Sequence, residues 1–295
     1  LKEGVNVSEH LANGLKCATC HNDLTTYTRF TVGKVEFPSG ASLGFATGEE
    51  AVDSDLCLNC HQGRQSGSGL AAAIARAAVG DDEASEALRF SNPHYFAAGA
   101  TLFGSEANGA YEYAGKEYNG QFKHVPGFDN CQGCHDAHAL KVKVEACTSC
   151  HTTVKSHEDL ATIRMSEGDF DGDGDATEGI AMEVEHMADA LYVAMQANAT
   201  DNGLPGIVWN AASYPYWFTD TNGNGEADPD ESVRTNGYAS WTPRLLQAAY
   251  NYTWVQKDPG AFAHNGMYMI QVLYDTLESL GAADGMTRPE VKAAE

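Results

Sequence analysis

The sequence predicts a fold in two parts. Residues 1–157 are expected to be largely irregular, with short helices and β-hairpins, and residues 158–295 are expected to be α-helical. All eight cysteines lie in the first part, in four copies of the pattern Cys-x-x-Cys-His that end at residues 21, 61, 135 and 151. After residue 157 there are no cysteines, and apolar residues recur at helical spacing. We therefore expect the four motifs to organise the first part of the chain.

The Cys-x-x-Cys-His pattern is the attachment signature of c-type haem, in which two thiols add to the vinyl groups and the histidine ligates the iron. Four copies predict four covalent haems. The predicted thioether-forming residues are Cys17, Cys20, Cys57, Cys60, Cys131, Cys134, Cys147 and Cys150, and the predicted proximal iron ligands are His21, His61, His135 and His151.

Disulfides and zinc sites are two other uses of cysteine. Eight cysteines could form disulfides, but disulfides give no reason for a histidine directly after every second cysteine. Zinc would need tetrahedral sites completed by further ligands, and no cysteine remains outside the four motifs. Haem attachment accounts for both the spacing and the histidines.

The sixth iron ligand is expected to be a second histidine. Methionine is the other common axial ligand and raises the reduction potential, but the methionines mostly sit among apolar neighbours at helical spacing. The sequence therefore favours bis-histidine, low-potential haems. The distal ligand candidates are His10, His94, His124, His138 and His264, whereas His157 and His186 lie in charged helical contexts and are interpreted as surface residues.

The net charge of −23 argues against nucleic acid or an anionic membrane surface as a partner. No apolar run approaches the ~20 residues that a membrane-spanning helix needs. Haem is attached outside the cytoplasm, so we expect an exported protein whose signal peptide was removed before Leu1. Sequons at Asn6, Asn198 and Asn251 leave glycosylation open.

Several elements are expected in the first part of the chain. Residues 25–37 alternate around Gly33-Lys34 and predict a β-hairpin, and residues 111–118 predict a second one. Residues 70–79 and 81–90 are expected to be helices, and a short strand is expected through Val142 and Val144. Because the third and fourth motifs are separated by so little chain, their haems are expected to lie close together.

Two acidic loops in the second part resemble calcium-binding loops of the EF-hand type. The candidate ligands are Asp169, Asp171, Asp173, Asp175 and Glu178 in the first loop, and Asp220, Asn222, Asn224, Glu226, Asp228 and Glu231 in the second. The first loop has Ile180 where an EF-hand has glutamate at position 12, so Glu178 or a later carboxylate would have to substitute. Acidic turns without a bound ion are the alternative.

Three helices are expected in the second part. One covers residues 182–196, and another starts at Pro243, after the N-cap Thr242, and runs to residue 256. The last carries Ile270, Leu273, Leu277 and Leu280 on one face and is stopped by Gly281. His264 is expected in the connection between the last two helices, where it would reach one of the haems.

The run from Cys131 to His151, the two acidic loops and the segment from Lys257 to Asn265 resemble the exported multihaem c-type cytochromes of anaerobic bacteria and archaea. More narrowly, four haems on a chain of this size resemble the tetrahaem cytochromes that polymerise into extracellular filaments, the cytochrome nanowires. The resemblance implies a multihaem cytochrome c fold and electron transfer by hopping between stacked haems, with no bond-making at any iron.

The narrower resemblance also implies partners. These are further copies of the chain, upstream redox cytochromes and an extracellular acceptor. In such filaments one haem takes a histidine from the neighbouring subunit, and His10 has the best position for that role here. Two alternatives stay open: a soluble periplasmic electron carrier, and a multihaem reductase of a small oxyanion or nitrogen compound, which would need an iron with an open position.

Overall fold

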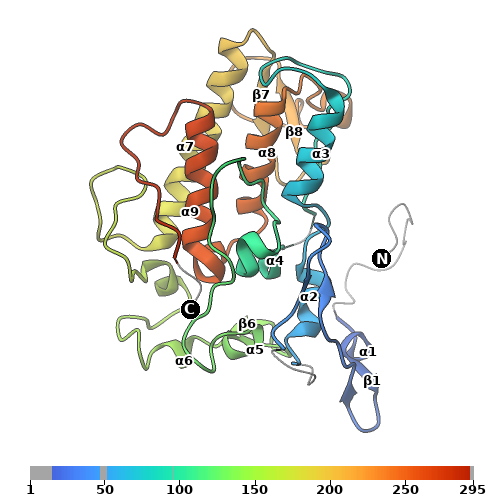
Figure 1. Ribbon diagram of the computed structural model, residues 1–295, viewed down its shortest axis with the longest axis vertical. Coiled ribbons are helices and arrows are strands. Elements are labelled where there is room, and N and C mark those ends of the chain that lie inside the picture. The colour runs from blue at the N-terminus through green and yellow to red at the C-terminus, as the bar shows by residue number, and fades with distance from the viewer. Residues whose placement is uncertain (1–14, 47–51, 95, 293–295) are drawn as a thin grey trace.

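Three long helices form the centre of the structure (Figure 1). The structure is a computed structural model and describes residues 15–46, 52–94 and 96–292. The long helices are α7 (Ile180–Asp201), α8 (Pro243–Gln256) and α9 (Ala261–Ser279), and each packs against the other two. A shorter helix from the first part of the chain, α4 (Ala98–Phe103), packs on α9. Among the described residues, no helix is both long enough and apolar enough to cross a bilayer.

One hydrophobic core joins the two parts of the chain. It includes Leu58 and Phe103 from the first part together with Trp254 and Leu273 from the second, and all four are almost completely buried. The indole Nε1 of Trp254 donates a hydrogen bond to the hydroxyl of Thr101 at 3.1 Å. The long helices therefore support the elements that carry the cysteine motifs.

The predicted second-part helices are present with the expected end signals. The hydroxyl of Thr242 accepts a hydrogen bond from the backbone N–H of Leu245 at 3.1 Å, with Pro243 in the first turn of α8. Gly281, with a φ of +71°, follows the end of α9. A helix in the first part of the chain is capped in the same way: the hydroxyl of Ser66 caps α3 (Gly67–Ala77) by accepting a hydrogen bond from the backbone N–H of Gly69.

Helix α9 is kinked one turn after its start. Asn265 has non-helical backbone angles (φ −166°, ψ 71°), and its buried amide donates to the carbonyls of Leu102 and Gly120. His264 therefore lies in a separate first turn of α9, and the expectation that it lies in the connection before the helix is wrong by one turn. The kink ties this turn to the first part of the chain.

The remaining elements are short and include four two-stranded antiparallel sheets. The strands are β1 (His21–Asp23) with β2 (Thr28–Arg29), β3 (Val35–Glu36) with β4 (Ser42–Leu43), β5 (His135–Asp136) with β6 (Lys141–Val142), and β7 (Gly206–Trp209) with β8 (Trp217–Asp220). The other helices are α1 (Cys17–Cys20), α2 (Asp55–His61), α5 (Cys131–Cys134), α6 (Val144–Cys147), and the 3-10 turns η1 (Gly104–Glu106), η2 (Glu158–Thr162) and η3 (Arg234–Asn236).

The hairpin predicted over residues 25–37 is wrong. Two hairpins flank its expected turn, and Gly33 lies in the connection between β2 and β3. The turn of the β3–β4 hairpin is formed by Pro38-Ser39-Gly40, where the N–H of Gly40 donates to the carbonyl of Phe37 at 2.8 Å. The predicted strand through Val142 and Val144 is right for Val142 in β6 and wrong for Val144, which begins α6.

Two more predicted elements do not form. Residues 81–90 are not helical, and the N–H of Ser85 donates instead to the carbonyl of Trp241. Residues 111–118 form no strand, because side chains satisfy their backbone groups: Tyr111 N–H donates to the side chain of Asn251 at 2.7 Å. Asn251 is fully buried, so this sequon does not accept a glycan in the folded chain; Asn6 lies outside the described residues.

Candidate haem and metal sites

The Cys-x-x-Cys pairs of the first three motifs lie in short helices, α1, α2 and α5. After the first and third motifs, the histidine begins a β-hairpin, so His21 and His135 occupy equivalent positions in β1 and β5. The fourth motif begins at the last residue of α6 and continues as a turn. No disulfide joins any of the eight cysteines in the structure.

Three motif histidines each face one of the predicted distal histidines. The imidazole centroids of His21 and His138 lie 6.3 Å apart with ring planes 10° from parallel. Those of His151 and His124 lie 6.2 Å apart, with planes at 38°. Those of His135 and His264 lie 6.3 Å apart, with planes at 32°.

This separation fits two axial ligands of one metal ion. A metal–imidazole bond is about 2 Å long, so two imidazoles on opposite sides of an iron have ring centroids roughly 6 Å apart. Rings in van der Waals stacking would be closer than that. Other ring pairs share this separation, Phe122 with His124 at 6.3 Å among them, so the weight lies in the partners: each of the three pairs joins a motif histidine to a predicted distal histidine. The three pairs therefore fit the bis-histidine haems that the sequence predicts.

His61, in the second motif, does not belong to these three pairs. Its Nδ1 hydrogen-bonds the carbonyl of Phe96 at 3.0 Å, which brings the segment containing His94 near it. His94 is exposed, has a φ of +81°, and its backbone N–H donates to the side chain of Asn92. His10 lies outside the described residues.

Motifs that follow one another along the chain also lie next to one another in space. The thiol of Cys131 donates to the carbonyl of Ser54, directly before α2, at 4.0 Å, and its interaction with the sulfur of Cys57 lowers the pKa of Cys57 to about 7, so the second and third motifs adjoin. Burial, and then the nearby Cys57 and Cys60, raise the pKa of Cys20 in the first motif. Burial, and then Cys147, raise the pKa of Cys134 in the same way. Figure 1 shows the motif-bearing elements α2, α5 and α6 along the lower side of the molecule.

A buried carboxylate holds one of the distal histidines. Asp258 is 2 % exposed, and its two oxygens lie 2.8 and 3.0 Å from Nδ1 of His264. Burial alone would lower the pKa of His264, but the charge and hydrogen bond of Asp258 together raise it. Since Nδ1 is held by Asp258, Nε2 is the nitrogen left for a metal.

The first acidic loop gathers most, but not all, of its predicted ligands. Carboxylate oxygens of Asp171, Asp173 and Glu178 lie close together, and Asp169 groups with Asp171 and Glu183. Asp175 instead accepts hydrogen bonds from the backbone and hydroxyl of Thr177. Carboxylates of the loop therefore stabilise its turn by accepting hydrogen bonds from the loop's own backbone N–H groups.

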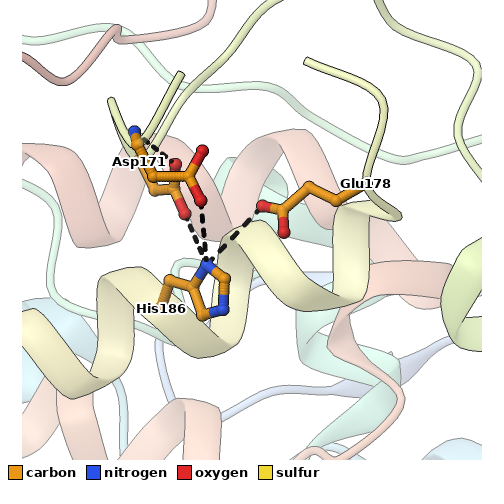
Figure 2. Close-up of side chains that lie close together, drawn as sticks. Asp171, Glu178 and His186 are labelled. Atoms are coloured by element: carbon orange, nitrogen blue, oxygen red, sulfur yellow. Dashed lines mark hydrogen bonds and ion pairs between the residues drawn. The ribbon is translucent and has the colours of Figure 1, made fainter. Parts of the chain in front are cut away.

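His186 is a surface residue, as expected, with a side chain that is 41 % exposed, but it also belongs to this cluster, which the sequence pattern did not predict. Its Nδ1 lies 2.7 Å from Asp171 and 3.6 Å from Glu178, as Figure 2 shows. The hydrogen bond with Asp171 is the main reason why the pKa of His186 is raised. A sequence signal existed: Glu183 and His186 lie three residues apart at the start of the helix that follows the loop, so both face the same side. His157, by contrast, is exposed.

The second acidic loop follows β8 and contains no histidine. Asp220 accepts from the N–H groups of Gly223 and Gly225, and the amides of Asn222 and Asn224 both donate to Asp228. Glu226 is exposed.

Glu231, at position 12 of this loop, is 3 % exposed. Its Oε1 accepts three hydrogen bonds, from the N–H and hydroxyl of Thr221 and from the N–H of Asn222. Its Oε2 is buried and accepts none. A buried carboxylate oxygen without a donor fits a cation ligand, as at position 12 of an EF-hand loop.

Comparison with known proteins finds relatives along most of the chain. The C-type polyheme cytochrome OmcC of Geobacter sulfurreducens is 30 % identical over 265 residues, which cover 82 % of this chain and 31 % of that protein. The C-type polyheme cytochrome OmcB of Geobacter sulfurreducens is 28 % identical, over 92 % of this chain and 35 % of that protein. The chain therefore spans about a third of the length of the curated relatives it matches. No family model matches it, and no solved structure shows significant similarity to it.

Proposed function

We propose that this chain, a homologue of the multihaem c-type cytochromes, binds four covalent haems and transfers electrons by hopping between them. The observation that carries the proposal is the set of three histidine pairs at 6.2 to 6.3 Å, each joining a motif histidine to a histidine from elsewhere in the chain. Six-coordinate irons favour electron transfer, because a reductase needs an open coordination position.

In this proposal the eight motif cysteines hold the haems, and the axial pairs are His21 with His138, His135 with His264, and His151 with His124. Bound haem supplies one-electron iron chemistry. The chain fixes the spacing of the haems, because each motif lies in space beside the next motif along the sequence. It also excludes water from part of the site, since Leu58, within the second motif, is fully buried in the hydrophobic core.

Haem content and spin state test this assignment. We expect four haems per chain by pyridine haemochrome assay and only low-spin ferric signals in low-temperature EPR. Changing His124, His138 or His264 to alanine should each convert one haem to high spin, whereas His157→Ala, at an exposed histidine outside the pairs, should convert none. A high-spin signal in the native protein would favour a reductase, and unchanged spectra in all three variants would refute the pairing.

The second-motif iron has two proposed ligands, His94 from the same chain and His10 from a neighbouring one. The two choices lead to different assemblies. If His94→Ala produces the high-spin haem, all four irons are ligated within one chain. If His10→Ala does so, and only in the assembled protein, the neighbour supplies the ligand.

We also propose that the chain forms part of an exported assembly that conducts electrons from upstream cytochromes to an extracellular acceptor, as a filament subunit. Like charges repel between copies with a net charge of −23, so assembly would need a strong junction such as iron ligation by His10. Electron microscopy of the native protein in calcium buffer tests this. Regular filaments support it, and single particles of one chain would favour a soluble periplasmic carrier.

The two acidic loops are proposed to bind structural cations. Loop 220–231 offers only oxygen ligands, including the unpartnered buried Oε2 of Glu231, and this is the ligand type that Ca²⁺ takes. Calcium was expected at loop 169–178 as well, but His186 brings a nitrogen donor to that loop. The chemistry of the two loops therefore differs.

A further inference from the structure

The imidazole of His186 points into the carboxylates of the first acidic loop. Its Nδ1 lies 2.7 Å from Asp171 Oδ2, 3.6 Å from Glu178 Oε1 and 3.9 Å from Asp173 Oδ2. One ligand atom from each of these four residues lies within 4.8 Å of every other. Ligands bonded to one transition-metal ion at about 2 Å lie roughly 3 to 4 Å apart, so these four atoms would need to move only slightly to bind one ion.

A second observation points to a ligand at this place. The side chain of Glu178 is only 7 % exposed, and its Oε1, on the side facing His186 (Figure 2), has no hydrogen-bond donor. Leaving a buried carboxylate oxygen without a donor costs free energy. A bound cation would remove this cost.

The neighbouring carboxylates are already used by the protein. Glu183 is fully buried, and its oxygens accept from Arg164 at 2.7 Å and from the N–H groups of Phe170 and Asp171 at 3.0 and 2.8 Å. Asp169 accepts from the N–H groups of Gly172 and Gly174. These two residues shape the loop, which leaves Asp171, Asp173, Glu178 and His186 as the ligand set.

We propose that Asp171, Asp173, Glu178 and His186 bind a divalent transition-metal ion such as Zn²⁺, rather than Ca²⁺. The inference builds on the cation sites of the proposed function and changes the metal assigned to this loop. Imidazole is a ligand of zinc, copper, iron and nickel, whereas calcium takes six to eight oxygens. The chain therefore has two loops of similar pattern that select different ions, because only the first is completed by a histidine.

The test uses the haem-loaded protein, stripped of loosely bound metal by a chelator. Zinc binding is measured by calorimetry in the presence of excess calcium, and the zinc-edge X-ray absorption spectrum reports imidazole ligands without interference from haem iron. We expect one tight zinc site with imidazole scattering. His186→Ala should weaken zinc binding at least tenfold and remove that scattering, and His157→Ala, at an exposed histidine outside the cluster, should change neither.

Calcium binding serves as the reference. Asp228→Asn, in the second loop, should weaken calcium binding and leave zinc binding unchanged. Calcium bound at both loops with zinc affinity equal in wild type and His186→Ala would overturn the zinc inference alone, leaving His186 as an ion-pair partner of Asp171. Binding of neither ion would overturn it together with both proposed cation sites. Haem content and EPR are measured on the same samples, so failure of the haem proposal is recognised separately.

Discussion

At the scale of single residues, the histidines proposed as axial ligands differ in what holds their second ring nitrogen. His21 and His61 hydrogen-bond neutral backbone carbonyls, of Tyr27 at 2.6 Å and Phe96 at 3.0 Å. His264 is held instead by the buried carboxylate of Asp258. A carboxylate makes an imidazole a stronger donor to its metal and so favours the oxidised ion.

We therefore expect Asp258→Asn to raise the reduction potential of the haem proposed between His135 and His264. Replacing the charged hydrogen bond by a neutral one should destabilise the oxidised haem by about 1 to 2 kcal/mol, which raises the reduction potential of a one-electron couple by roughly 40 to 90 mV. Potentiometric titration followed by EPR measures the shift. Asp275→Asn is the matched control, because Asp275 is also buried but pairs with Arg288. Equal shifts in both variants would show that Asp258 has no special role.

The sequence could identify single ligands but not their partners. The spacing of each motif identifies its proximal histidine, and setting aside methionine and the histidines in charged helical contexts leaves His124, His138 and His264 among the distal candidates. Pairing depends on the long-range fold: His264 reaches His135 because the Asn265 kink attaches the first turn of α9 to the backbone near Leu102 and Gly120. The charged neighbours of His186 in sequence correctly indicate a surface position, but they do not show that its ring contacts the carboxylates of the first acidic loop.

At the scale of elements, the first acidic loop is tied to α7 by a buried ion pair between Arg164 and Glu183. Arg164 also donates to the carbonyls of Glu178, Gly168 and Ser166, so one guanidinium holds both ends of the loop. Removing one partner of a buried pair leaves an uncompensated charge.

Arg164→Met should therefore lower the free energy of unfolding by about 3 to 5 kcal/mol, measured by urea denaturation. A companion variant separates the ion pair from packing: Arg164→Met with Glu183→Gln should recover part of the loss, because no buried charge is left unpaired. A loss below about 1 kcal/mol in the single variant would mean that Glu183 has another source of compensation.

The segment that was expected to be a helix over residues 81–90 is anchored by a different kind of contact. The guanidinium of Arg244, in the first turn of α8, donates to both oxygens of Asp82 at 2.7 and 3.0 Å. These hydrogen bonds lower the pKa of Asp82. A long-range anchor of this kind overrides local helix propensity and cannot be seen in the segment itself.

Because the folded-state pKa of Asp82 is lowered, its contribution to stability is present above the unfolded pKa of ~3.9 and is lost as pH falls through the lower folded value. The side chains of Arg244 and Asp82 are both partly exposed, so we expect this ion pair to add only about 0.5 kcal/mol to the free energy of unfolding. Asp82→Asn should lower the melting temperature slightly at pH 7 and have no effect near pH 2. A difference that persists at pH 2 would assign the effect to packing.

Local signals explain which elements could be predicted. The helix over residues 243–256 has a Thr-Pro start, and the end of α9 has a glycine stop, so both boundaries follow from backbone chemistry. Hairpins β1–β2 and β5–β6 begin at motif histidines, where alternation of apolar residues gives no signal. Such short strands are positioned by the motif turn before them rather than by their own pattern.

At the scale of the whole molecule, hydrophobic packing crosses the boundary expected at residue 157. That all haems are attached before this boundary stays a prediction. Leu58 and Phe103 share one core with Trp254 and Leu273, and the histidine pair His135–His264 joins the third motif to α9. A boundary between independently folding domains would carry few such contacts.

This packing predicts cooperative unfolding. In urea, far-UV circular dichroism, which follows α7, α8 and α9, and the haem Soret band, which follows axial ligation, should give the same midpoint in the haem-loaded protein, because neither part keeps a complete core alone. Leu273→Ala should lower both midpoints together, by an amount equivalent to about 2 to 5 kcal/mol. Separate midpoints, or a change in the helical signal alone, would show instead that the haem-binding part folds without the helices, and that His264 docks onto an already formed site.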